Sequence, residues 1–319
     1  MTQTTISKAA KVVLTIVLFG VFPKVNAQYD AMFTQYMFNE MFINPAFAGS
    51  KEALAVSLHH RQQWVGFAGR PVTTTFTAHM PLFRNTMGVG LCFLSEKLGV
   101  LSRNLIYANY AYRVRLSGKS YLTFGVMGGA HLQSEKLAAI NTVEPGDPNF
   151  SVNTPTVITP NFGFGIMYTT EKFYAGISVP RLLDDNIKVS SDGTILGNNK
   201  VVLNKFHYYA TIGKVFVLGP NLKIVPQLML KAVSNAPFQF DVNVNALMKE
   251  RLWLGLSYRS RADISGLAGV YITPQLLLTY SYDYPLTILH DYTSGSHEIG
   301  ISYTFRFKGK KVVSPRYFL

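Results

Sequence analysis

The sequence predicts an all-β fold: an antiparallel transmembrane β-barrel of about 14 strands, preceded by an irregular N-terminal leader. The first observation behind this prediction is the stretch 296–307, where large apolar residues occupy every second position from Ile299 onward. The residues between them are small or polar, so a strand here has one apolar and one polar face. Its length of about ten residues suits a tilted strand that crosses the hydrocarbon of a membrane.

The second observation is the composition. The chain holds 22 Phe and 18 Tyr, yet only 15% of its residues are charged and its net charge is +13. No stretch after residue 27 approaches the roughly 20 apolar residues that a membrane helix needs. Aromatic richness without such a stretch is typical of a membrane barrel, whose apolar residues occupy alternate positions. Amphipathic strands also occur in soluble sandwiches, so composition alone leaves both classes open.

The third observation is how the connections between strands are sorted. We expect strands at residues 52–60, 71–80, 86–95, 104–115, 120–133, 160–169, 172–179, 204–214, 221–231, 236–248, 251–259, 264–273, 275–283 and 296–307. In a membrane barrel with both ends in the periplasm, the odd-numbered connections are the external loops. The longest connections, 134–159 and 180–203, follow the fifth and seventh strands, whereas those after the fourth, sixth, tenth and twelfth are tight. A soluble sandwich has no reason to sort its connections in this way, so the barrel is favoured.

The remaining parts of the chain are assigned around this barrel. Residues 1–27 have the features of a signal peptide, with Lys8 and Lys11 before an apolar core and a small-residue cleavage site ending at Ala27. Residues 28–50 lack a two-residue period and are expected to form a periplasmic or plugging leader. The barrel is expected over 51–308, with a basic periplasmic tail over 309–319. The predicted location is the bacterial outer membrane.

The polar faces of the strands indicate what the barrel interior contains. In 251–259, four residues of one face (Leu252, Leu254, Leu256, Tyr258) oppose four of the other (Trp253, Gly255, Ser257, Arg259), whereas 86–95 alternates poorly. Cys92, the single cysteine, is expected to serve in packing. Fourteen strands enclose more room than their side chains readily fill, so the lumen is expected to be wet or plugged.

The sequence offers no constellation of residues for catalysis. It has no Gly-x-Ser-x-Gly elbow, no phosphate-binding glycine loop and no His-Glu-x-x-His helix. His59 and His60 are adjacent and so point to opposite faces of a strand, and Asp184-Asp185 is expected to be a solvated turn. His297-Glu298 and Asp283 would form an acid–base pair only if the fold joined them, and structural hydrogen bonding is the preferred interpretation. We therefore expect no enzymatic activity, no cofactor and no metal site.

Three polar clusters contain the candidate functional residues. The first, in the leader, comprises Gln35, Tyr36, Asn39, Asn44, Pro45 and Gly49. The second follows the first strand and comprises Arg61, Gln63, Trp64, Gly66 and Phe67. The third lies near the end of the chain and comprises Asp283, Tyr284, Gly295, His297 and Glu298. Such residues are often partner contacts, but they also fix loops and seal barrel ends, so both interpretations stay open.

In this order, the three clusters resemble the PorP/SprF family, outer-membrane proteins of the type IX secretion system of Bacteroidetes. The leader is similar to that family's Gln-Tyr…Asn…Ile-Asn-Pro-Ala-aromatic-Ala-Gly opening, and the other two clusters match as well. The resemblance spans essentially the whole chain after the signal peptide. It departs at Tyr29-Asp30, where the family often has Asp-Pro after the first Gln, and at Glu40, where a proline commonly stands.

The resemblance implies a non-enzymatic barrel that supports secretion or surface anchoring of partner proteins, such as gliding-type adhesins. Its implied partners are the periplasmic ring or cell-wall-linked parts of the type IX machinery, a secreted surface protein and outer-membrane lipid, with no nucleic acid. The leader (Gln35, Tyr36, Asn39, Asn44) would dock the machinery, and loops 134–159 and 180–203 would meet cargo. The alternative is a passive outer-membrane channel for small solutes.

Overall fold

The computed structural model describes residues 31–51, 53–140, 150–184, 187–189, 195–197, 200–201, 206–233 and 237–305. The expected signal peptide (1–27) and C-terminal tail (309–319) lie outside these residues. The division of the chain into signal peptide, leader, barrel and tail therefore stays a prediction. Within the part of the chain that the structure describes, no helix is long and apolar enough to span a membrane.

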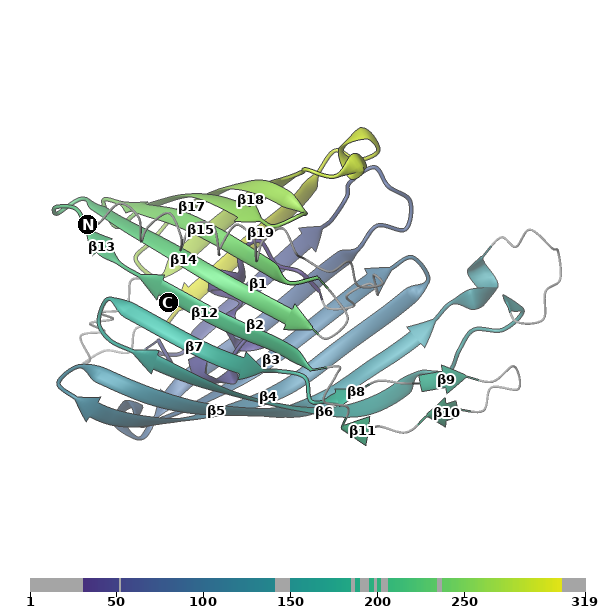
Figure 1. Ribbon diagram of the computed structural model, residues 1–319, viewed down its shortest axis with the longest axis horizontal. Helices are drawn as coiled ribbons and strands as arrows, with labels where there is room; N and C mark the ends of the chain where they lie inside the picture. Colours follow the sequence, from purple (N-terminus) through teal and green to yellow (C-terminus); the bar gives the residue numbers. More distant parts are fainter. Residues whose placement is uncertain are drawn as a thin grey trace, which may run out of the picture.

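The described residues form a closed antiparallel β-barrel (Figure 1). Its wall strands are β1 (Ala55–Gln62), β2 (Val72–Leu82), β3 (Met87–Leu98), β4 (Leu101–Ser117), β5 (Ser120–Glu135), β6 (Val157–Thr169), β7 (Phe173–Val179), β12 (His207–Lys214), β14 (Leu222–Val233), β15 (Gln239–Met248), β16 (Leu252–Arg259), β17 (Asp263–Tyr271), β18 (Leu276–Pro285) and β19 (Ser296–Thr304). The short β13 (Phe216–Val217) continues β12 against β14 in the same register. Pairing of β1 with β19 and of β12 with β14 closes the circle. The predicted fourteen-stranded barrel is confirmed.

Side chains alternate between an apolar outer face and a polar lumen. In β16, Leu254 and Leu256 are exposed on the outside, whereas Ser257 and Arg259 are buried inside. Alternation is weak in the sequence of β3 because its lumen face is also apolar there: buried Leu94 and Cys92 oppose exposed Leu91 and Phe93. The reason lies inside the barrel, where part of the N-terminal segment packs against this strand.

The connections separate into two ends of the barrel. The short-turn end carries the tight connections, such as 118–119 and 170–172. The long-connection end carries 63–71, 136–156, 180–206 and 286–295. Within 180–206, β8 (Leu183–Asp184) pairs with β11 (Lys200–Val201), and β9 (Ile187–Val189) pairs with β10 (Ile195–Gly197). The expectation of a solvated turn at Asp184-Asp185 is thus wrong for Asp184, which lies in a short ladder, while Asp185 lies outside the described residues.

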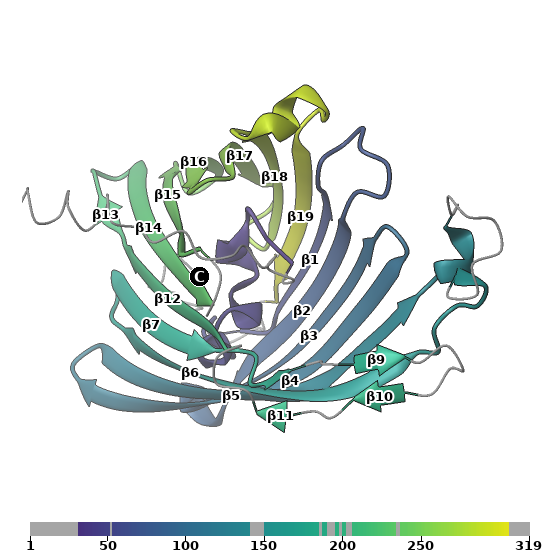
Figure 2. The ribbon, with the colours of Figure 1, turned by 45° about the vertical axis from the view of Figure 1, so that its right-hand side comes forward.

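Residues 31–50, here called the lumen segment, lie inside the barrel (Figure 2). The segment contains three short 3-10 turns, η1 (Tyr36–Phe38), η2 (Glu40–Phe42) and η3 (Pro45–Phe47). Its first residues contact the ends of β18 and β19 at the long-connection end, and its last residues contact β2–β4 near the short-turn end. The segment therefore runs along the lumen before the chain enters β1.

Candidate functional site: the network that holds the lumen segment

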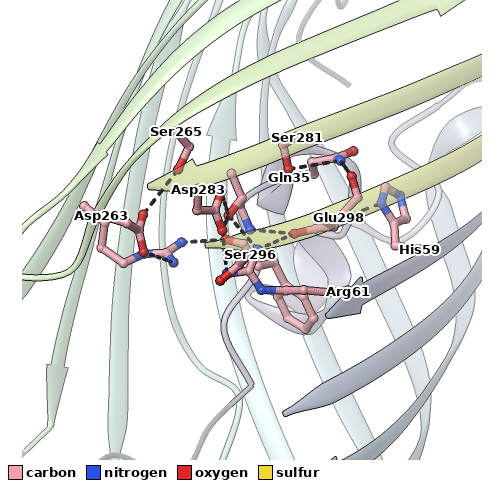
Figure 3. A network of polar contacts seen from close by, with 12 residues as sticks. Gln35, His59, Arg61, Asp263, Ser265, Ser281, Asp283, Ser296 and Glu298 are labelled. Carbon is pink, nitrogen blue, oxygen red and sulfur yellow. Dashed lines mark hydrogen bonds and ion pairs between the residues drawn. The ribbon is translucent and has the colours of Figure 1, made fainter. Parts of the chain in front are cut away.

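Arg61 lies at the centre of a buried ionic network on the lumen wall (Figure 3). The register of β1 against β19 places Arg61 directly opposite Glu298. Its Nη1 lies 3.1 Å from Glu298 Oε2, and its Nη2 lies 2.7 Å from Asp283 Oδ2 on β18. All three side chains are nearly inaccessible to solvent. Two carboxylates therefore share one guanidinium, which is the arrangement that allows such charges to be buried.

The lumen segment joins this network through Thr34 and Gln35. The Thr34 hydroxyl donates to Asp283 and accepts a hydrogen bond of 2.8 Å from Arg61 Nη1. The Thr34 backbone N–H donates to Glu298 Oε2 at 2.9 Å. Gln35 Nε2 donates to the backbone carbonyl of Glu298 at 2.9 Å and, more weakly, to the hydroxyl of Ser281. The first sequence cluster is thus tied to the second and third in one place.

A second buried ionic group adjoins the first. Arg259 on β16 is the cross-strand neighbour of Asp241 on β15 and of Asp263 on β17. Its Nε lies 2.9 Å from Asp241 Oδ2, and its Nη1 lies 3.5 Å from Asp263 Oδ2. Its Nη2 donates to the backbone carbonyl of Phe33 at 2.7 Å. The wall therefore hydrogen-bonds two successive residues of the lumen segment: Arg259 binds Phe33, and Arg61 binds Thr34.

Further along, the lumen segment contacts glycines on the inner face of the wall, here called the glycine track (Gly88, Gly125 and Gly165). Asn44 caps η3 by accepting from the Ala46 N–H at 2.9 Å, and its amide donates to the carbonyls of Ile166 and Ile177 at 3.3 Å each. A Cβ placed on Gly165 would lie 2.1 Å from Asn44 Oδ1, and one on Gly125 would lie 2.1 Å from Ala46 N. Such distances are far below van der Waals contact, so neither position has room for a side chain: Gly125 lies against the backbone of Ala46, and Gly165 lies against the side-chain amide of Asn44.

The segment is held again where it meets the short-turn end. Gly49 has φ +67°, and a Cβ there would lie 2.6 Å from Gly88 Cα. Its N–H donates to His79 Nδ1 at 3.1 Å, and its carbonyl accepts from Arg113 Nη2 at 3.3 Å. The Asn-Pro-Ala-aromatic-Ala-Gly run therefore fits the space beside the wall, because its small residues Ala46, Ala48 and Gly49 lie where the lumen segment contacts wall glycines.

Other leader residues are buried against the wall as well. Tyr36 packs with Ile43 and Met229, and Asn39 accepts a hydrogen bond of 3.3 Å from the Thr75 hydroxyl. Gln35, Tyr36, Asn39 and Asn44 are each at most 2% exposed. These side chains contact the barrel in this structure, and docking of secretion machinery by them would require the segment to leave the lumen.

One leader carboxyl lies in an unfavourable position. Burial raises the pKa of Glu40, in η2, well above its usual value, and the charge of Lys51 opposes part of this rise. Burial likewise lowers the pKa of Lys51. Glu40 Oε1 is buried and accepts no hydrogen bond from the described residues. The docked position of the lumen segment is therefore unfavourable for the charged form of Glu40.

The remaining candidate residues lie at the long-connection end, next to the network. The Val65 N–H donates to Gly295 O at 2.8 Å, and the Ser294 N–H donates to Val65 O at 2.7 Å, which joins connection 63–71 to connection 286–295. Gln63 pairs with Pro71 through its backbone, and the Trp64 N–H donates to Ser296 Oγ. At Gly295, φ is +82° and a Cβ would lie 2.5 Å from Asp283 O.

The outer surface of this end is aromatic. Phe67, next to Gly66 (φ +97°), is 47% exposed, and Tyr284 is 48% exposed and stacks on His290. His297 faces outward and hydrogen-bonds the Tyr280 hydroxyl at 2.7 Å, on the face opposite Glu298. The fold therefore joins Glu298 to Asp283 through Arg61, and it separates His297 from both.

Several residues of the network carried no signal in the sequence. Thr34, Arg259 and Asp263 belong to no motif, and their roles depend on cross-strand register and on the path of the lumen segment. The lumen glycines could have been found as glycines at inward positions of predicted strands, because glycine inside a strand often marks a close backbone approach. Among the described residues, no group of three or more His, Cys, Asp or Glu side chains is arranged to hold a metal ion.

Comparison with known families identifies the family of this chain. Residues 25–303 match the family described as type IX secretion system membrane protein PorP/SprF. The chain belongs to the PorP/SprF family. As a β-barrel of this secretion-system membrane family, it is a protein of the bacterial outer membrane and a component associated with the type IX secretion machinery. Comparison with curated protein sequences gives no match.

Solved structures align with this PorP/SprF barrel at low sequence identity. The CymD monoaromatic hydrocarbon channel aligns with a TM-score of 0.51 at 12% identity, over 89% of this chain and 95% of that one. The P. putida toluene transporter TodX aligns at 0.48 and 10% identity, over 84% and 94% of the two chains. Acinetobacter baumannii Omp33 aligns at 0.46 and 10% identity, over 81% and 100%. At these identities, the likeness to CymD concerns the fold alone.

Proposed function

We propose that this PorP/SprF barrel is a non-enzymatic scaffold that supports secretion or surface anchoring of partner proteins, such as adhesins, with its lumen closed by residues 31–50. The observation that carries the proposal is the buried network of Arg61, Asp283 and Glu298, which fastens Thr34 to the wall. A segment fastened along the lumen closes the path for solutes in this state, which favours a scaffold over an open pore. A barrel built to hold other proteins gains a rigid wall from it.

The partner surface is proposed at the long-connection end. Phe67, Ile288 and Tyr292 are exposed there by 47%, 77% and 69%. They lie on the two connections that the Val65–Gly295 and Ser294–Val65 hydrogen bonds join. Exposed aromatic side chains on a rigid support are common energetic centres of protein interfaces. The longer connections 134–159 and 180–203 extend from the same end and are proposed to meet cargo.

The test compares the surface and secreted proteomes of cells with and without the gene. Loss of one large surface protein is expected for a dedicated anchor or export partner, and loss of all type IX cargo for a core component of the machine. An unchanged proteome in both fractions would overturn the proposal. Deleting residues 180–203 should leave barrel insertion intact but reduce cargo retention, and unchanged retention would remove the cargo role of that connection.

The passive-channel alternative is tested by conductance of the purified protein in planar bilayers. We expect no stable open current from the full chain, because the lumen segment occupies the path. A chain whose lumen segment is released by substitution should conduct more than the wild type. A stable ohmic pore in the wild-type protein would favour the channel and contradict a closed lumen.

A further inference from the structure

A hollow of about 340 Å³ lies on the lipid-facing wall of the barrel, over the neighbouring strands β6, β7, β12 and β14 (Figure 1). Ala175 and Ala210 are the small outward-facing side chains of its lining. Larger side chains border them, among them Tyr168, Ile212 and Leu228. Sites that hold small ligands typically measure about 300–1,000 Å³. The hollow therefore has room for part of an apolar chain.

The hollow reaches the membrane interface on its short-turn side. Phe173 packs against Tyr168 there with ring centroids 6.3 Å apart, and Phe216 is 44% exposed. Aromatic side chains gather where the hydrocarbon meets the headgroups. In outer-membrane barrels the short turns face the periplasm. The headgroups nearest the hollow therefore belong to lipids of the periplasmic leaflet.

Lys214, on β12, lies just beyond the hollow on the same outward face as Ile212. Two residues along a strand span about 7 Å. The neighbours of Lys214 in the chain, Gly213 and Val215, are buried, and its ammonium lies 5.0 Å from the ring centroid of Phe216. A lysine on an apolar wall lays its stem along that wall and keeps its ammonium at the polar boundary. Lys214 therefore places a positive charge at the short-turn edge of the hollow.

A second lysine lies in the neighbouring connection. Lys172 is exposed in the turn between β6 and β7, and its backbone carbonyl accepts a hydrogen bond of 2.8 Å from the Val215 N–H. The carboxylate of Glu171, in the same turn, pairs with Lys119. Among the described residues, neither Lys172 nor Lys214 forms an ion pair with a carboxylate. Both ammonium groups are therefore available to an anion at this edge.

We propose that this part of the wall binds an anionic phospholipid of the periplasmic leaflet. One acyl chain would lie in the hollow over Ala175 and Ala210, and the phosphate would lie at Lys172 and Lys214. A zwitterionic headgroup carries a cation of its own, which the two ammonium groups repel, so a headgroup with a net negative charge is preferred. The site lies at the opposite end of the barrel from the proposed partner surface, so either proposal can fail without the other.

A second hollow on the lipid-facing wall lacks such cations. It measures about 670 Å³, lies over β2 to β6, and has no lysine or arginine in its lining. The outward-facing residues between it and the short turns are Leu82, Met87, Tyr112 and Phe124. This second hollow is a matched control, because it offers apolar surface to an acyl chain but no charge to a headgroup.

The experiment is native mass spectrometry of the purified protein in detergent, titrated with dioleoylphosphatidylglycerol or with its zwitterionic counterpart dioleoylphosphatidylcholine. The two lipids have the same acyl chains, so a difference between them reports on the headgroup alone. We expect the first phosphatidylglycerol to bind at least about fivefold more tightly than the first phosphatidylcholine. The reason is that each lysine beside an anionic headgroup contributes a gain of roughly fivefold.

Four substitutions separate the charge from the hollow. Lys214→Gln should weaken phosphatidylglycerol binding about fivefold and leave phosphatidylcholine binding unchanged. Lys249→Gln removes an exposed lysine of another short turn, between β15 and β16, and should have no effect. Ala210→Leu fills the hollow and should weaken phosphatidylglycerol binding. Ala108→Leu makes the same change in the second hollow and should leave that binding intact.

Three results would overturn the proposal: equal binding of the two lipids, unchanged phosphatidylglycerol binding in folded Lys214→Gln, or equal effects of Ala210→Leu and Ala108→Leu. Heat-modifiable electrophoretic mobility reports whether each variant is folded. If a variant does not fold, the comparison of phosphatidylglycerol with phosphatidylcholine on the wild-type protein decides alone.

Discussion

The guanidinium of Arg61 lies 2.7 Å from the carboxylate of Asp283 and joins the first strand of the barrel to the last but one. The same guanidinium binds Glu298 on the strand between them and the hydroxyl of Thr34 in the lumen segment. Replacing a complete buried ion network by apolar residues is often neutral for stability, whereas removing one partner is strongly destabilising. The network thus makes the first of the contacts that hold the lumen segment depend on Arg61.

Arg61→Met should release the lumen segment, because Asp283 and Glu298 would then be buried without their counter-charge. Loss of one partner of a buried pair costs about 3–5 kcal/mol. The single cysteine offers a readout: Cys92 is 1% exposed and packs in the same cluster as Met41, Ala46 and Phe47 of the lumen segment. Its labelling by a water-soluble maleimide should therefore become on the order of 10²-fold faster or more.

The control for this variant is a surface pair. Lys119 and Glu171 form an ion pair between exposed turns, and such pairs contribute roughly 0–1 kcal/mol. Lys119→Met should leave the labelling rate of Cys92 nearly unchanged. Equal labelling rates in wild type and Arg61→Met would mean that the network does not hold the segment.

Gly125→Val should also displace the lumen segment, because even a Cβ at this position would lie 2.1 Å from the backbone nitrogen of Ala46. Gly128, three residues along the same strand, gives the matched control. A Cβ there would meet the ring of Phe162 at 3.4 Å, which is ordinary contact on the outer face of the barrel. Fast labelling of Cys92 in folded Gly125→Val but not in Gly128→Val is the expected result. Equal rates in the two variants would contradict the glycine track.

The wall of the barrel was predictable from the sequence because each strand carries its own evidence. Residues such as Leu254 and Leu256 must face lipid, and a shift by one residue would place Arg259 there instead. The alternation of long and short connections along the chain is a second, independent indication of a membrane barrel, because it places them at opposite ends. The strand 86–95 was hard to interpret because Cys92 and Leu94 face the lumen segment, so both of its faces are apolar.

The site could be predicted only in part. The clusters containing Asn44, Arg61 and Glu298 stood out as departures from the lipid-facing pattern, but nothing in the sequence said that they meet. Their meeting depends on the β1–β19 register that closes the barrel and on the path of the lumen segment. Both are non-local, so residues such as Thr34 and Asp263, which act only through those contacts, gave no local signal.

Asn44 is expected to hold the lumen segment by two separable contacts. Asn44→Asp keeps an acceptor for the Ala46 N–H but loses the amide that donates to the Ile166 and Ile177 carbonyls. Asn44→Ala loses the cap as well, which adds about 1 kcal/mol. Both variants should label faster at Cys92 than wild type, since buried carbonyls would lose their donor. Wild-type labelling rates in both variants would show that Asn44 does not hold the segment.

The docked state of the lumen segment should weaken as pH rises, because of Glu40. Burial raises the pKa of Glu40 above its usual value of 4.5, so the docked segment binds this proton more tightly than the released one. Docking is therefore most stable below about pH 4.5 and loses stability as pH rises towards the raised pKa, by up to about 1.4 kcal/mol per pH unit. Glu40→Gln removes the titrating group and should remove this dependence.

The measurement is the ratio of Cys92 labelling rates in wild type and Glu40→Gln at each pH, since the ratio cancels the pH dependence of the thiol chemistry itself. The ratio should lie near one at pH 4.5 and rise towards neutral pH, because only the wild type must bury a charge there. The ammonium of Lys51 opposes part of the rise in the pKa of Glu40, so in a Lys51→Gln background the ratio should go on rising to a higher pH. Glu171→Gln changes an exposed carboxylate and should label like the wild type at every pH. A ratio that stays flat between pH 4.5 and 8 would show that Glu40 keeps an ordinary pKa in the lumen.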